Sequence, residues 1–166
     1  MASYTRKVLT SLIFISTCVL PSIALSSPEF QQQLEEADSL RSANPKKFDE
    51  LLIRLDRNAA NASADQLEHL RYLQAYKLAY TGQFNLAIQK ASAIYDKTQN
   101  IDLKYRAGLL VVNSYATTRD LGAGFAFLDK TLLLQDKITD RQLRHDGFML
   151  PSLIVKYGSD NETIVT

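Results

Sequence analysis

The segment from Leu67 to Tyr95 constrains the fold more than any other part of the chain, because it carries two helical patterns separated by a glycine. On both sides of this glycine, apolar residues recur at intervals of three and four, the spacing that places side chains on one face of a helix. They are Leu67, Leu70, Leu73, Ala75 and Leu78 before it, and Phe84, Ala87, Ile88, Ala91 and Ile94 after it. Gly82 can take the left-handed conformation that ends a helix. The sequence therefore predicts an antiparallel helix pair that reverses direction at Thr81 and Gly82.

Most of the remaining chain has the same periodicity and predicts an all-α fold. The 166 residues are 46% hydrophobic and rich in Leu and Ala, with little of the β-branched alternation that indicates strands. About seven helices are expected after residue 27. Those outside the central pair are expected over residues 30–40, 45–59, 103–119 and 140–157, with a further one carrying Phe125, Leu128, Leu132 and Leu133. The helix over 103–119 is apolar almost all round, which predicts that neighbours cover it on both sides.

Short motifs indicate where several of these helices begin. Asn44 supplies a capping side chain, and the proline that follows it suits the first helical position. The pattern from Ser63 to Gln66 is a capping box that opens the central pair. A second box, from Thr139 to Gln142, is expected to open the last helix.

Residues 1–26 have the three-part plan of a cleavable secretory signal peptide. Two basic residues precede an uncharged apolar run over residues 8–20, which is followed by small residues. Cleavage is expected after Ala24 or Ser26, and either site leaves a mature chain of about 140 residues. The sequence therefore predicts export to the periplasm.

Two other interpretations of this leader fit the residues less well. Pro21 and the shortness of the apolar run argue against an uncleaved membrane anchor. Cys18 loosely resembles a lipoprotein processing site, but the threonine directly before it departs from that pattern. Because Cys18 lies in the leader, the mature chain needs no disulfide in an oxidising compartment. No apolar run of membrane-spanning length follows residue 27, so we expect no membrane span in the mature chain.

Charge and motif content give little support for nucleic-acid binding or catalysis. Lys and Arg total 19 and Asp and Glu total 18, so no basic excess is present to hold a polyanion. His69 and His145 lie far apart, and neither has a second ligand at metal-binding spacing. Gly122-x-Gly124 lacks the third glycine and the preceding strand of a dinucleotide loop. We expect no metal, no cofactor and no enzymatic activity, with an enzyme of unrecognised site as the weaker alternative.

The turn of the central pair resembles a tetratricopeptide repeat, in which Gly-x-aromatic-x-x-Ala leads into the second helix. Gly82, Phe84 and Ala87 occupy these positions. Placing Leu121 and Gly124 on Phe84 and Ala87 gives a second repeat at a spacing of 37 residues, slightly longer than the usual repeat of about 34. The resemblance implies a right-handed solenoid of stacked antiparallel helix pairs, the last pair incomplete, with close helix contacts at Ala87 and Gly124.

In tetratricopeptide arrays the first helix of each pair lines a concave groove, and this resemblance implies a set of ligand contacts. They are His69, Tyr72, Tyr76, Tyr80, Arg106, Asn113 and Thr117. Independently of any family, the three tyrosines are four residues apart and form a stripe along one helix. Tyrosine offers a rigid apolar ring with a polar tip, which suits a groove for a peptide or small molecule. The alternative is that these rings fill the space between helices, as aromatic residues commonly do.

A wider resemblance covers nearly all of residues 28–157. The segments 37–48, 72–83 and 106–115 are similar to the exported sensory region of membrane-bound bacterial diguanylate cyclases, where tetratricopeptide-like helices precede a transmembrane helix and a catalytic domain. The catalytic signature Gly-Gly-Asp-Glu-Phe does not occur in this chain. The resemblance therefore implies a non-catalytic periplasmic sensory or protein-interaction module, with residues 28–166 as its helical-repeat domain.

A free-standing periplasmic adaptor or scaffold is the alternative to this input region. Both functions involve a peptide, protein or small-molecule ligand bound by the repeats. The sequence leaves open the identity of that ligand, the oligomeric state, and whether the chain belongs to a longer signalling protein.

Overall fold

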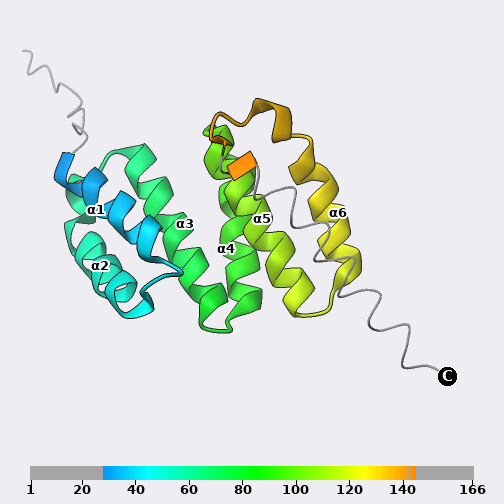
Figure 1. Cartoon of the computed structure of the whole chain (residues 1–166), viewed down its shortest axis with the longest axis horizontal. Coiled ribbons are helices and arrows are strands. Elements are labelled where there is room, and N and C mark those ends of the chain that lie inside the picture. The colour runs from blue at the N-terminus through cyan, green and yellow to red at the C-terminus, as the bar shows by residue number, and fades with distance from the viewer. Residues whose placement is uncertain (1–27, 142, 145–166) are drawn as a thin grey trace, which may run out of the picture.

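The computed structural model describes residues 28–141, 143 and 144, and every regular element in this range is helical (Figure 1). The elements are α1 (Pro28–Leu40), α2 (Pro45–Asn58), α3 (Ala64–Tyr80), α4 (Phe84–Lys97), α5 (Ile101–Thr117) and α6 (Leu121–Leu132), with 3-10 helices η1 (Ala59–Asn61) and η2 (Gln135–Lys137). The all-α prediction is confirmed for these residues. The predicted leader, His145 and most of the helix expected over 140–157 lie outside them.

Consecutive helices form three antiparallel pairs that lie side by side: α1 with α2, α3 with α4, and α5 with α6 (Figure 1). The first helices of the pairs adjoin, because α1 and α5 both contact α3, and α4 packs along α5. The central pair turns where the sequence predicts. Gly82, between α3 and α4, has a φ of 81°, a conformation that glycine adopts without the steric cost of a side chain.

The second and third pairs keep the predicted spacing of 37 residues. Helices α3 and α5 both have 17 residues, and their N-caps are Ser63 and Asn100. Arg119 follows Gly82 by the same 37 residues, and it is the described non-glycine residue with a positive φ, 62°. Two different sequences therefore build the same turn, one with glycine and one with arginine in the left-handed region.

The predicted helix starts in the first half of the chain are confirmed. Asn44 accepts a hydrogen bond from the N–H of Lys47 at 3.1 Å. In the capping box, Ser63 Oγ accepts from the N–H of Gln66 at 3.3 Å, and Gln66 Oε1 accepts from the N–H of Ser63 at 3.0 Å. These side chains satisfy backbone donors that have no partner within the helix.

The second predicted capping box extends to Gln142, which lies outside the described residues. Thr139 donates its hydroxyl to Asp102 Oδ2 at 2.5 Å and its N–H to Oδ1 at 3.0 Å. Asp140 also caps here, because its carboxylate accepts from the N–H of Leu143 at 3.2 Å. Thr139 is therefore bonded to α5, a contact that the predicted box does not include.

Two helix boundaries and one apolar stripe also differ from the predictions. Helix α5 begins two residues before the expected start, because Asn100 Oδ1 accepts from the N–H of Leu103 and caps the helix there. It ends two residues early, before the left-handed residue that follows. In the predicted α6 stripe, Leu128 is buried, whereas Phe125 is 41% exposed and Leu133 lies beyond the helix in solvent.

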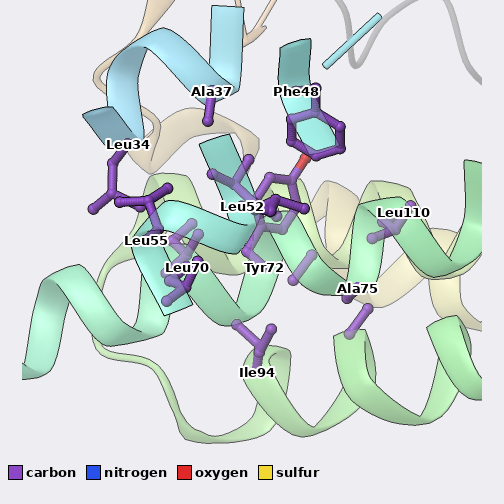
Figure 2. Packing of buried hydrophobic residues seen from close by; sticks show 14 of the residues in the cluster. Leu34, Ala37, Phe48, Leu52, Leu55, Leu70, Tyr72, Ala75, Ile94 and Leu110 are labelled. Carbon is purple, nitrogen blue, oxygen red and sulfur yellow. The ribbon is translucent and has the colours of Figure 1, made fainter. Parts of the chain in front are cut away.

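The largest hydrophobic cluster extends from α1 to α5 and is shown in part in Figure 2. Leu34, Phe48, Leu55 and Leu73 are fully buried in it. Eight of the 17 residues of α5 are buried, and this helix packs between α4 and α6. The prediction that α5 is covered on both sides is therefore confirmed.

Small residues allow the helices around α5 to approach closely. Ala87 is fully buried, and a Cβ added to Gly124 would lie 3.4 Å from Tyr115 Cβ, so the expected close contact of α6 with α5 is confirmed. The sequence did not predict a tighter contact, which lies at Gly108. A Cβ on Gly108 would lie 2.5 Å from Thr131 Oγ1, closer than real Cβ contacts allow.

Candidate functional site

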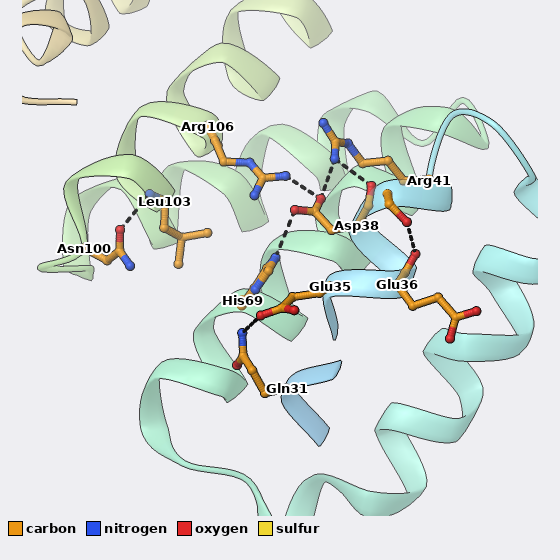
Figure 3. A network of polar contacts seen from close by, with 10 residues as sticks. Gln31, Glu35, Glu36, Asp38, Arg41, His69, Asn100, Leu103 and Arg106 are labelled. Carbon is orange, nitrogen blue, oxygen red and sulfur yellow. Dashed lines mark hydrogen bonds and ion pairs between the residues drawn. The ribbon is translucent and has the colours of Figure 1, made fainter. Parts of the chain in front are cut away.

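A polar cluster centred on Asp38, in the last turn of α1, joins the first helices of all three pairs (Figure 3). Arg41, just after that helix, donates from Nη1 to Asp38 Oδ1 at 2.5 Å. Arg106 of α5 donates from Nη2 to the same oxygen. His69 of α3 places Nε2 3.5 Å from Oδ2. One carboxylate thus connects three helices that are distant in sequence, and we call these four residues the Asp38 cluster.

The repeat spacing explains why two of these side chains converge. His69 and Arg106 are 37 residues apart and occupy the same position in α3 and α5. Since both helices present this position toward α1, both side chains reach Asp38. The side chains of Asp38 and Arg106 are each only 18% exposed, so their charges interact through little water.

The surroundings of Asp38 determine its protonation. Burial by itself raises the pKa of Asp38, because it disfavours the charged carboxylate. The nearby His69 side chain, the hydrogen bond from Arg106, and the charges of Arg106 and Arg41 outweigh burial and hold the pKa of Asp38 well below its usual range. A carboxylate with so low a pKa stays ionised and accepts a proton poorly near neutral pH. Asp38 is therefore suited to be a fixed counter-ion rather than a general base.

Tyr72 supports this cluster from the hydrophobic core. It is 5% exposed, and the guanidinium carbon of Arg106 lies 4.6 Å from the centroid of its ring, a cation–π geometry. Burial raises the pKa of the Tyr72 phenol. The Arg106 guanidinium thus contacts both a carboxylate and an aromatic ring. Three predicted site residues, His69, Tyr72 and Arg106, are brought together around Asp38.

The other two tyrosines of the stripe lie in different surroundings. The hydroxyl of Tyr76 is 3.1 Å from Ser42 Oγ, and its ring packs edge-on against Phe48 with centroids 6.1 Å apart. Tyr80 is 52% exposed. The stripe therefore runs from the core to solvent, and the contacts of Tyr72 and Tyr76 favour the packing interpretation for these two rings.

The two remaining candidates lie on the later turns of α5, outside the Asp38 cluster. Asn113 and Thr117 are both exposed. The hydroxyl of Thr117 donates to the backbone carbonyl of Asn113 at 2.8 Å, a bond within the helix. The structure therefore divides the seven predicted residues into a clustered group and an exposed group.

Sequence reasoning missed Asp38 and Arg41. They are three residues apart, the spacing at which opposite charges meet on a helix. This spacing was the available signal. The partners on α3 and α5 carry no sequence signal, because the pairing depends on where α1 packs.

Next to this cluster, a polar hollow of about 550 Å³ opens beside His69 and Arg106. Most of its polar lining already has protein partners. Glu35 accepts from Gln31, and Asp102 accepts from Thr139. This hollow offers a ligand few uncommitted hydrogen-bonding groups.

A larger groove of about 780 Å³ lies between α2 and α4, with α3 as its floor. We call it the α2–α4 groove. Its apolar lining consists of Leu52, Ile53, Ala75, Leu78, Ala93 and Ile94. Ile53 is 50% exposed and lies on the α2 side of this groove. The volume lies within the range of about 300–1,000 Å³ typical of ligand sites.

One face of helix α3 contacts the Asp38 cluster, and the opposite face lines the α2–α4 groove. At about 100° per residue, the positions of Tyr72 and Tyr76 point away from those of Arg71, Gln74 and Leu78. The first two contact the cluster, and the last three line the groove. The candidate residues predicted from the sequence do not line this groove, whose polar residues are typical of an ordinary solvated helix face.

Two structural findings and the comparison with known proteins bear on function. Within residues 28–141, 143 and 144, no group of three or more His, Cys, Asp or Glu side chains is arranged to hold a metal ion. None of the helices in this range combines the length and apolar character needed to span a membrane. Comparison of the chain with known protein families, curated proteins and solved structures finds no match.

Proposed function

We propose that this chain is a non-catalytic interaction module that binds a segment of another polypeptide in the α2–α4 groove. The observation that carries this proposal is the groove itself, whose lining combines apolar side chains, among them the half-exposed Ile53, with charged ones. Fully desolvated apolar anchors with a polar rim are the usual composition of protein interfaces. The face formed by α1, α3 and α5 is less suitable, since its charged groups pair with one another.

In this proposal the helix pairs form a right-handed, tetratricopeptide-like solenoid of about seven helices. The constant spacing of 37 residues between the second and third pairs supports a repeat architecture. In a solenoid each pair contacts mainly its neighbours, so grooves between successive second helices are a regular product of stacking.

The cellular role that fits this module is the periplasmic input region of a diguanylate cyclase-type signalling protein. The leader over residues 1–26 and the family resemblance support it. A free-standing periplasmic adaptor is the second candidate, and it uses the same groove. Nucleic acid is not a proposed partner, because basic and acidic residues nearly balance.

Site-specific photo-crosslinking tests the binding of a polypeptide. A benzoylphenylalanine at Ile53 should give a discrete protein adduct in cells of the native host. The matched control is the same residue at Phe125, which is similarly exposed, 41% against 50%, but lies on α6 outside the groove. No adduct from Ile53, or the same adducts from both positions, would refute the proposal.

A further inference from the structure

Three cationic side chains in the lining of the α2–α4 groove have no ion-pair partner among the described residues. Arg71 of α3 and Lys90 and Lys97 of α4 are exposed and line the groove. Within the part of the chain that the structure describes, none of these three has an ion-pair partner. The fourth cation of the lining, Lys77, is paired with Asp49 at 2.9 Å. Three cations are therefore available to a ligand.

The two carboxylates of the groove offset this charge only in part. Asp56 accepts a hydrogen bond from Gln74 Nε2 at 2.6 Å. Glu68 accepts from Thr98 Oγ1 at 2.6 Å. Both donors are neutral, so each carboxylate keeps its negative charge. The three unpaired cations still outnumber the two carboxylates, and the lining keeps a small net positive charge.

Apolar and cationic groups are interleaved on α4, where Ala93 and Ile94 lie between Lys90 and Lys97. Ile53 lies across the groove on α2. These lysines are seven residues apart, which corresponds to about 10 Å along a helix or two turns. A second helix lying in the groove would meet them with side chains spaced by the same seven residues. One of its faces would cover Ile53, and an adjacent face would lie against the lysines.

We propose, on the basis of the proposed function, that the bound segment is an amphipathic helix with an acidic flank. Its apolar stripe packs against Ile53 and Leu78. Its carboxylates, about two turns apart, pair with Lys90 and Lys97. This is the helix-in-groove mode of recognition, with charge complementarity selecting the partner.

Two synthetic peptides of about 18 residues, long enough to span the groove as helices, test the charge requirement. Both carry the same leucine stripe, and one has glutamate on its flank where the other has lysine. Fluorescence anisotropy measures their affinity for the chain. The acidic peptide should bind saturably and at least about tenfold more tightly than the basic one, with a preference that weakens as salt is raised.

Two variants with the same change in net charge locate the effect. Lys90→Glu/Lys97→Glu should abolish or reverse the preference for the acidic peptide. Lys46→Glu/Lys137→Glu, which alters exposed lysines outside the groove, should leave it unchanged. Circular dichroism shows whether each variant is folded.

Several results would overturn the proposal. These are saturable binding of neither peptide, preference for the basic peptide, and equal losses in the groove and control variants. Displacement of the acidic peptide by dodecanoate at lower concentration would assign the groove to an anionic lipid instead. If the Ile53 adduct in cells persists in Lys90→Glu/Lys97→Glu, the proposed function survives and the acidic partner is refuted.

Discussion

Replacing Asp38 by asparagine removes the charge at the centre of the cluster that joins α1, α3 and α5. The change is nearly isosteric, so it tests charge rather than packing. Arg106 would keep a guanidinium that is 18% exposed and has lost its carboxylate. Removing one partner of a buried ion pair costs about 3–5 kcal/mol, because the other charge stays desolvated. Since some water reaches this pair and asparagine can still accept one hydrogen bond, we expect about 3 kcal/mol.

A surface ion pair between Glu36 of α1 and Lys47 of α2 provides the control. Glu36 lies 2.5 Å from Lys47, with side chains 42% and 51% exposed. Glu36→Gln should cost less than about 1 kcal/mol, because water screens this pair. Thermal unfolding followed by circular dichroism should show a loss of about 10 °C in Tm for Asp38→Asn and much less for the control.

A double-mutant cycle separates the pair from the single residues. If Asp38 and Arg106 stabilise each other, Asp38→Asn/Arg106→Gln should be less destabilised than the sum of the two single variants by about 1 kcal/mol or more. Equal shifts in Tm for Asp38→Asn and Glu36→Gln, or strict additivity in the cycle, would refute the reasoning that this cluster holds the pairs together.

Four further predictions follow from the structure. Because the pKa of Asp38 is lowered in the folded state, its stabilising effect is complete above the unfolded carboxyl pKa of about 3.9, and is lost as the pH falls through the lower folded value. The Tm difference between wild type and Asp38→Asn should therefore narrow in acid. Gly108→Ala should destabilise by about 1–3 kcal/mol in urea unfolding, because the added methyl group overlaps a buried threonine. Tyr76→Ala should cost about 3 kcal/mol and Tyr76→Phe about 1 kcal/mol by the same assay, since the ring packs on the core and the hydroxyl makes one hydrogen bond. Gly82→Ala should destabilise the fold and Arg119→Gly should stabilise it, by about 1 kcal/mol each in unfolding free energy measured by calorimetry, because both positions have a positive φ.

The elements that could be predicted from sequence are those fixed by neighbouring residues. Gly82, the Ser63 capping box and the Asn44 cap were all identified from a few adjacent residues, and the structure confirms them. The bond from Thr139 to Asp102 could not be predicted for the complementary reason. The two residues are 37 positions apart, and no local pattern records their contact.

The Asp38 cluster could be predicted only in part. The spacing of 37 residues correctly placed His69 and Arg106 at equivalent positions, which is why the structure brings them together. The periodicity of the three tyrosines predicted that they share one side of a helix, but not how deeply each of them is buried. Tyr72 is covered while Tyr80 is exposed, and this difference depends on the length and placement of the neighbouring helix.

The α2–α4 groove could not be predicted, because it results from how one helix pair sits on the next. On one face of α3, the Asp38 cluster ties α1 and α5 to it. Helix α2 packs on α3 through the largest hydrophobic cluster, and two polar contacts add to this packing: Asp49 with Lys77 and Asp56 with Gln74. This packing joins the first two pairs but leaves a space between α2 and α4 above α3. No pattern within a single helix records that space, because its walls come from two different pairs. The groove thus depends on tertiary packing, and it is the feature on which the proposed binding function depends.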